Sequence, residues 1–125
     1  MQSGLIPILR IGTTLLASIQ TELRDTSAQA FQQDVLKAIE KSRSRGLIID
    51  ITGLDMVDTF VARILTDTGR MAKLMGTETV LVGMRPEVAA TLVRMGFSMQ
   101  GVQTALNVDE GLALLASLQR SQARS

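Results

Sequence analysis

The sequence predicts an α/β domain with a mixed, mostly parallel sheet of four to five strands and about four helices. Short apolar runs alternate along the chain with longer stretches whose apolar residues recur at helical spacing. Parallel strands need long crossover connections, so this alternation favours a largely parallel sheet with helices packed on it. The length of 125 residues suits one domain. Because no stretch has the composition of a linker, we expect a single domain over residues 1–125, with a flexible tail over 120–125.

The first half of the chain predicts two strands, a helix and a buried strand, in that order. Residues 6–20 are rich in β-branched and aliphatic side chains and are interrupted at Gly12, which predicts two short strands joined by a turn. A capping box beginning at Thr26 and the apolar spacing that follows it predict a helix over 27–44. The nearly continuous apolar run 46–52 is typical of a central strand that is covered on both faces.

The second half continues the alternation of helix and strand. Apolar residues at helical spacing from Phe60 onward predict a second helix, and residues 79–83 predict another buried strand. Pro86 suits the first turn of a third helix, where its missing backbone N–H needs no partner. Residues 102–106 predict a short strand, and the Asn107 that follows suits the start of a last helix.

Composition excludes most catalytic and metal-binding chemistry. The chain has no Cys and no His, which removes thiolate nucleophiles, Cys-based metal sites and the usual general base near neutral pH. It has no Trp or Tyr to stack on bases or sugars, and its formal net charge is +1. We therefore expect a cytoplasmic protein that is not an enzyme, holds no metal or cofactor, and binds neither nucleic acid nor a membrane.

Two further features have structural interpretations that we prefer. The basic run 41–45 could attract RNA, but it is more typical of a solvated helix end. The seven methionines could line an adaptable partner surface. Those at helical spacing, such as Met71, Met75 and Met95, are instead predicted to lie in the core.

The stretch from Asp50 to Phe60 is the main candidate for a functional site. In an open α/β sheet, sites form outside the carboxyl ends of the strands, where loops lead into helices. This stretch carries three carboxylates, and Thr59 immediately precedes the helical pattern, so its hydroxyl should lie at or near the N-cap. Thr59 could be a helix cap only, with the carboxylates keeping the loop soluble. Asp50, Asp55 or Asp58 could alternatively accept phosphate with Mg²⁺, as in a receiver domain.

Five segments in a fixed order resemble one known family. They are the ranges 47–53, 57–62, 74–76, 82–89 and 92–96. Together they are similar to the STAS domain, the family of anti-sigma factor antagonists and related modules. Within that family the chain resembles the stressosome scaffold proteins, RsbS and the carboxyl-terminal half of RsbR, over essentially its whole length.

The resemblance implies a switch that is controlled by phosphorylation. Thr59, which follows Asp58, matches the Ser or Thr that a partner serine/threonine kinase phosphorylates at the start of the second helix. RsbS usually has Ser at this position and RsbR has Thr. Thr91 matches a second phosphorylated Thr of RsbR-like proteins, although by itself it suits a hydroxyl bonded back to its own helix. The switch-loop and partner-docking residues are expected to be Asp55, Asp58, Phe60 and Arg85.

The resemblance also implies the partners of the chain. They are an RsbT-like kinase that the scaffold binds and sequesters, RsbR-like STAS paralogues, further copies of the chain in a large complex, and an RsbX-like phosphatase. Two other functions stay open. One is a simple anti-sigma factor antagonist that binds an anti-sigma kinase directly, and the other is the receiver-like Asp phosphoacceptor.

Overall fold

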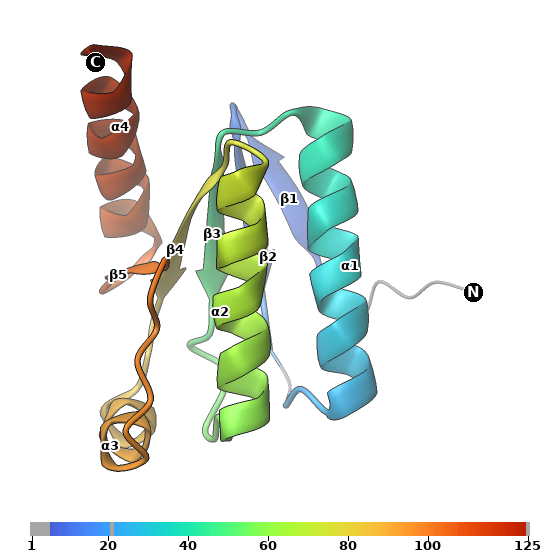
Figure 1. The fold of residues 1–125 in the computed structure, drawn as a ribbon, viewed down its shortest axis with the longest axis vertical. Helices are drawn as coiled ribbons and strands as arrows, with labels where there is room; N and C mark the ends of the chain where they lie inside the picture. The colour runs from blue at the N-terminus through green and yellow to red at the C-terminus, as the bar shows by residue number, and fades with distance from the viewer. Residues whose placement is uncertain (1–5, 21, 125) are drawn as a thin grey trace.

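A computed structural model describes residues 6–20 and 22–124 of the chain. Five strands and four helices follow one another along these residues, and every element that the sequence predicted is present (Figure 1). In chain order they are β1 (Ile8–Ile11), β2 (Thr14–Ser18), α1 (Asp25–Ser42), β3 (Gly46–Asp50), α2 (Thr59–Leu74), β4 (Glu78–Val82), α3 (Pro86–Arg94), β5 (Gln103–Ala105) and α4 (Val108–Arg124).

The five strands form one mixed sheet whose order follows the chain, β1-β2-β3-β4-β5. The hairpin β1–β2 is antiparallel, whereas the pairs β2–β3, β3–β4 and β4–β5 are parallel. Helices α1 and α2 lie side by side, and α4 packs against β3, β4 and β5. Figure 1 shows α3 beyond the end of the sheet at which the parallel strands finish. The predicted α/β class and the mostly parallel sheet are therefore confirmed.

Strand β3 is covered on both faces, as the sequence predicted. Leu47 and Ile49 lie in the larger hydrophobic cluster, which also contains the buried side chains of α1 and α2. Ile48 lies in a smaller cluster with Val80 and with Leu115 of α4. Because successive side chains point to opposite faces of a sheet, a strand buried on both faces needs an unbroken apolar run.

The start of α1 differs from the prediction. The helix begins at Asp25, and Arg24, rather than Thr26, is the residue that precedes its first turn. Ser27 Oγ accepts a hydrogen bond from the Arg24 backbone N–H at 2.8 Å, which is the half of a capping box that Glu or Gln usually provides. The capping box predicted to begin at Thr26 is therefore wrong by two residues, because a serine in the first turn makes the reciprocal bond.

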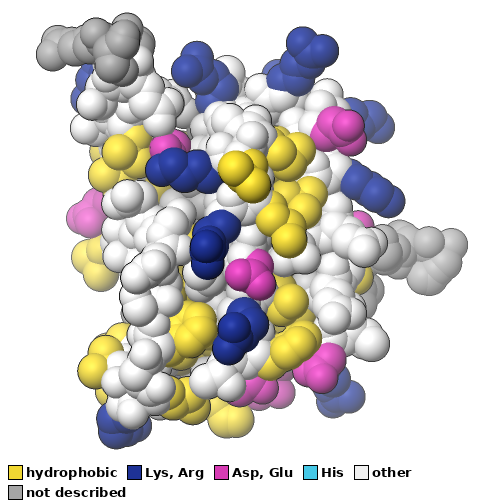
Figure 2. Space-filling model, in the orientation of Figure 1, with side chains coloured by type: hydrophobic (Ala, Val, Ile, Leu, Met, Phe, Trp, Pro, Cys, Tyr) yellow, Lys and Arg dark blue, Asp and Glu magenta, His cyan; other side chains and the backbone are white. Residues whose placement is uncertain are grey.

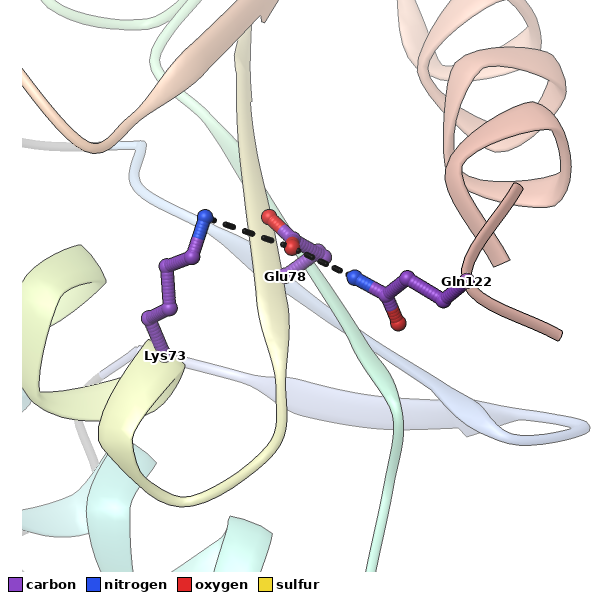
Figure 3. A network of polar contacts seen from close by, with 3 residues as sticks. All are labelled: Lys73, Glu78 and Gln122. Atoms are coloured by element: carbon purple, nitrogen blue, oxygen red, sulfur yellow. Dashed lines mark hydrogen bonds and ion pairs between the residues drawn. The ribbon is translucent and has the colours of Figure 1, made fainter. Parts of the chain in front are cut away.

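The end of α4 covers most of the segment for which a flexible tail over 120–125 was predicted. The helix continues to Arg124, and the last residue lies outside the described ones. Gln122 donates from Nε2 to Glu78 Oε2 at 2.9 Å, and the same oxygen is 3.5 Å from Lys73 Nζ (Figure 3). This network joins the last turns of α4 and α2 to the start of β4.

Three methionines that were predicted to lie in the core are exposed instead. Met71 and Met75, at the end of α2, are 41% and 43% exposed, and Met95, just after α3, is 50% exposed. Helix α2 buries a different side, which includes Leu65 and Ala72. Apolar spacing alone cannot distinguish a stripe that faces the core from a second apolar stripe that faces solvent.

Candidate functional site

The candidate site is built where β3 and β4 end and the chain turns into α2 and α3. The β3–α2 connection spans residues 51–58, and the β4–α3 connection spans 83–85. The two connections approach each other at Gly83, whose φ is +79°. A Cβ at this position would overlap Thr52 Oγ1 and lie 3.0 Å from Asp50 Oδ1. Glycine is therefore required both for the backbone conformation and for the close approach of the two loops.

Asp50 and Thr52 fix the first part of the β3–α2 connection. Asp50 Oδ1 accepts hydrogen bonds from the Thr52 backbone N–H at 2.9 Å and from the Thr52 hydroxyl at 2.6 Å. An aspartate that accepts from the backbone two residues later forms a local turn. The Asp50 carboxylate thus holds the shape of the loop and is occupied within its own segment.

Arg85 joins the two connections. Its Nη1 lies 3.1 Å from Asp55 Oδ1, and its Nε donates to the Thr52 carbonyl oxygen at 3.0 Å. The structure thus brings together Arg85 and Asp55, which the sequence predicted for the same switch-loop region. Their side chains are 46% and 78% exposed, so water screens the pair and its contribution to the free energy of unfolding is small. The pair provides a second link between the two loops.

From the sequence, Thr59 could be the helix cap or an accessible hydroxyl. In the structure Asp58 is the cap, and Thr59 carries the accessible hydroxyl. Asp58 is the N-cap of α2, and its Oδ1 accepts from the Val61 backbone N–H at 2.8 Å. Thr59 is the first helical residue and is exposed, and its hydroxyl forms no hydrogen bond with any other described residue. Thr59 therefore lies beside the cap, as predicted, but the interpretation of Thr59 as the cap itself is wrong. Its hydroxyl is left open to another molecule because the Asp58 carboxylate satisfies the helix end.

An apolar groove of about 310 Å³ lies beside the N-cap of α2. Asp58, the neighbour of Thr59, lines this groove together with Thr91 of α3. Of the two predicted phosphorylation sites, Thr91 lines the groove, whereas Thr59 follows a lining residue and does not itself line it. The other lining residues are Glu22, Leu23, Met56, Val57, Val61 and Met95.

The groove could not be found from the sequence. Its walls come from the segment before α1, from the β3–α2 connection and from α3, which are far apart along the chain. One local signal was available: Met56 is a large apolar residue in a loop, between Asp55 and Asp58, and in the structure its side chain is 69% exposed. A single exposed methionine is too common to predict a groove.

Thr91 and Phe60 have structural roles of their own. The Thr91 hydroxyl donates to the Glu87 carbonyl oxygen at 2.9 Å, which is the local helix bond that its sequence position suggested. Phe60, predicted as a docking residue, is half-buried and packs against the larger hydrophobic cluster. Modification of Thr91 would first have to break a bond within its helix, whereas Thr59 has no such bond to lose.

The three loop carboxylates, those of Asp50, Asp55 and Asp58, each interact with a different group. Each has its own partner: a threonine, an arginine and a helix N-terminus. In the part of the chain that the structure describes, no three His, Cys, Asp or Glu side chains group closely enough to hold a metal ion. No helix within that part is long and apolar enough to cross a membrane. The separate partners of the carboxylates give no support to a receiver-like Mg²⁺ site.

Comparison with known proteins assigns this arrangement of sheet, helices and loops to one family. The family model described as the STAS domain matches residues 6–111. The chain is a member of the STAS family. The matched range includes all five described strands and the loops of the candidate site, and it ends in the first turn of α4.

Among solved structures, this STAS domain is similar to an RsbS of Moorella thermoacetica. The two chains are 40% identical with a TM-score of 0.81, and the match covers 93% of this chain and 98% of the other. A structure described as the molecular architecture of the stressosome, a signal integration and transduction hub, also contains a similar chain. That chain is 40% identical with a TM-score of 0.78, over 91% of this chain and 99% of the other.

Among curated proteins, this STAS domain is similar to the RsbT co-antagonist protein RsbRA of Bacillus subtilis (strain 168). The two are 32% identical over 114 residues, which is 90% of this chain and 40% of RsbRA. This chain therefore spans well under half the length of that relative.

Proposed function

We propose that this STAS domain is a non-enzymatic regulatory scaffold of a cytoplasmic stress-signalling complex. It binds and sequesters an RsbT-like serine/threonine kinase, and phosphorylation of Thr59 controls that binding. The exposed Thr59 hydroxyl at the first residue of α2 is the observation that carries the proposal. Similarity to RsbS and to a stressosome chain supports the scaffold role, and similarity to a protein named as an RsbT co-antagonist supports the kinase as partner.

The proposed partners of the assembly follow from the same similarities, and the proposed phosphatase follows only from the family resemblance of the sequence. RsbR-like paralogues and further copies of this chain would build the complex, because the stressosome structure contains a chain of this kind. An RsbX-like phosphatase would remove the phosphate and restore the kinase-binding state. In this scheme the domain supplies surfaces and an acceptor, and its partners supply the catalysis.

The chemical step needs from this chain only an accessible hydroxyl. Thr59 Oγ attacks the γ-phosphorus of ATP in the kinase, and a new O–P bond forms as the bond to the β-phosphate oxygen breaks. ADP leaves, and the hydroxyl proton passes to a base of the kinase. The lack of His and Cys in this chain is therefore compatible with the role.

Phosphate on Thr59 would change the local field more than the stability of the fold. It adds about −1.5 to −2 charges at pH 7. The N-terminus of α2 favours that charge through its dipole, whereas the neighbouring Asp58 and the exposed Asp55 repel it. The two contributions offset each other within the domain. A kinase docked at this end loses affinity for two reasons. The added negative charge repels acidic groups of the kinase, and removing water from the phosphate on binding costs free energy.

The test compares Thr59→Ala with Thr59→Ser in the presence of an RsbT-type kinase and ATP. Intact mass measures the phosphate incorporated, and a pull-down measures the kinase retained. Thr59→Ala is expected to bind the kinase, to take no phosphate at this position and to keep the kinase bound. Thr59→Ser keeps a hydroxyl and is expected to be phosphorylated and to release the kinase. Phosphate incorporation into Thr59→Ala at the wild-type stoichiometry would remove Thr59 from the role.

The same samples test Thr91 and the receiver-like alternative. Thr91→Ala is expected to lose at most a second phosphate, with the first still on Thr59. Phosphothreonine survives acid treatment, whereas an acyl phosphate on an aspartate does not. Phosphate that is acid-labile and that persists in Thr59→Ala would favour the receiver-like function over the kinase-controlled scaffold.

A further inference from the structure

The C-terminal end of α2 exposes apolar side chains that the proposed phosphorylation does not use. Leu74 is 90% exposed, and Met71 and Met75 beside it are exposed as well. Residues three and four positions apart share one side of a helix, so the three side chains form one patch, which we call the apolar knob. Figure 2 shows hydrophobic side chains gathered on the upper part of the face formed by α2. Contiguous apolar patches on a protein surface can mark sites of interaction with a partner.

Basic side chains surround the apolar knob. Arg70 and Lys73 line a hollow on one side of it, and Arg43 and Arg45 line a second hollow on the other. Glu40 also lines the second hollow, and Lys73 already pairs with a glutamate of β4. Lys and Arg side chains predominate at this end of the molecule in Figure 2. The knob therefore presents apolar side chains within a positively charged rim.

The groove at the other end of α2 has the complementary character. Its lining is mainly apolar, with Met56, Val61 and Met95 among its residues. The charged residues in the lining are Glu22 and Asp58, and both are acidic. Its volume of about 310 Å³ is at the lower end of the range for ligand-sized pockets, so an apolar side chain can enter it.

We propose that the apolar knob of one copy of this chain docks into the groove of a second copy, head to tail. Knob and groove lie at opposite ends of one helix, so a single copy cannot bring them together. Between two copies, an apolar projection with a basic rim meets an apolar hollow with acidic lining residues. Because the contact joins two different patches, a pair of copies keeps one free groove on one copy and one free knob on the other, so the contact repeats into a ring or a filament. The inference rests on the proposed scaffold function and specifies how copies of the scaffold touch.

Two charged substitutions test the knob and the groove independently. Leu74→Glu disables the knob and leaves the groove, and Met56→Glu disables the groove and leaves the knob. Both positions are exposed, so both variants should fold, and thermal melting by circular dichroism checks this. In sedimentation velocity over a concentration series, we expect the wild-type chain to associate. Each variant should associate about thirtyfold more weakly, or worse, as for a central interface residue.

The mixture of the two variants tests the head-to-tail arrangement. Leu74→Glu carries an intact groove and Met56→Glu carries an intact knob, so an equimolar mixture should form one contact and stop at a heterodimer. Leu106→Glu is the matched control, because Leu106 is 73% exposed and lies outside both surfaces. It should associate like the wild-type chain. Association of the wild type should weaken as salt is added, since opposite charges face each other at the contact.

Three outcomes would overturn the inference: a wild-type chain that stays monomeric, a mixture that forms no heterodimer, or a Leu106→Glu control that fails like the other variants. Capture of a separate acidic protein by a wild-type chain that stays monomeric would assign the knob to that partner and also overturn it. Failure here is separable from failure of the proposed function. Leu74→Glu leaves the Thr59 end of α2 intact, so its phosphorylation by an RsbT-type kinase reports on the switch whether or not the copies associate.

Discussion

The two ends of α2 differ in how their side chains are held. At the Thr59 end, hydrogen bonds and an ion pair occupy the loop carboxylates, and one hydroxyl is left open. At the Leu74 end, apolar and basic side chains extend into solvent, and the described ion pair is the one between Lys73 and Glu78. One helix thus begins where polar contacts hold the loops beside an apolar groove, and it ends in exposed methionine and leucine side chains that can adapt to a partner. A site for modification needs a fixed position, whereas a contact surface gains from flexible side chains.

The buried side of α2 holds the two ends in a fixed relation. Val61, Leu65 and Ala72 are buried along its length. Gly69 lies on the same side, and a Cβ there would come within 2.5 Å of Val102 Cγ2. The absence of a side chain at Gly69 lets α2 pack closely against the segment that leads into β5. The comparison between the ends can therefore be tested by substitutions that leave the helix in place.

The largest expected difference in the free energy of unfolding is between a truncation on the buried side of α2 and one at its exposed end. Leu65→Ala truncates a side chain that is 1% exposed, so we expect the free energy of unfolding to fall by about 2–5 kcal/mol. Leu74→Ala removes the same atoms from a side chain that is 90% exposed and should change it by less than about 0.5 kcal/mol. Urea titration followed by circular dichroism measures both. Equal losses would mean that Leu74 packs against the fold.

A smaller difference in the free energy of unfolding is expected between substitutions of two glycines with positive φ, one near each end of α2. Gly83→Ala would force a Cβ against Thr52 in a left-handed conformation, and we expect a loss of about 2–4 kcal/mol. Gly76 has a φ of +87° but nothing within 4 Å of an added Cβ, so Gly76→Ala should lose only the backbone strain of about 1–2 kcal/mol. Chemical denaturation at 25 °C compares them. If Gly83→Ala is as stable as Gly76→Ala, the two loops do not need their close approach.

The smallest difference in the free energy of unfolding is expected between substitutions of Asp58 and of Thr59 at the start of α2. Asp58→Ala removes the N-cap and should reduce the free energy of unfolding by about 1 kcal/mol, whereas Asp58→Asn keeps an accepting oxygen and should lose less. Thr59→Ala should have an effect below about 0.5 kcal/mol because its hydroxyl has no described partner. Thermal melting of the three variants gives the ranking. A Thr59→Ala variant as unstable as Asp58→Ala would show that the hydroxyl shares the capping.

The order and type of the elements could be predicted because their signals are local. Pro86 begins α3, and Asn107 Oδ1 accepts from the Glu110 backbone N–H at 2.9 Å at the start of α4, as the sequence suggested. The capping residues of α1 and α2 were less predictable. Several neighbouring side chains compete for the same free backbone groups, and the backbone geometry selects among them; at α2 it selects Asp58 over Thr59.

The candidate site was predictable where it depends on strand direction. Parallel β3 and β4 end at the same edge of the sheet, so residues from their loops meet there, as Asp55 and Arg85 do. The groove beside them was not predictable. It forms where three segments far apart in the sequence leave space between their side chains, and no local pattern encodes that space.

The sequence by itself determined the α/β class, the order of strands and helices, and the position of Thr59 at the entrance to α2. Those features depend on hydrophobic periodicity and on capping chemistry within a few residues. Only the tertiary structure decided that the methionines of α2 face solvent, that residues 120–124 remain helical, and that a groove adjoins the Thr59 end. The physical reason is that a periodic pattern defines the faces of an element, whereas burial depends on which distant segments cover each face.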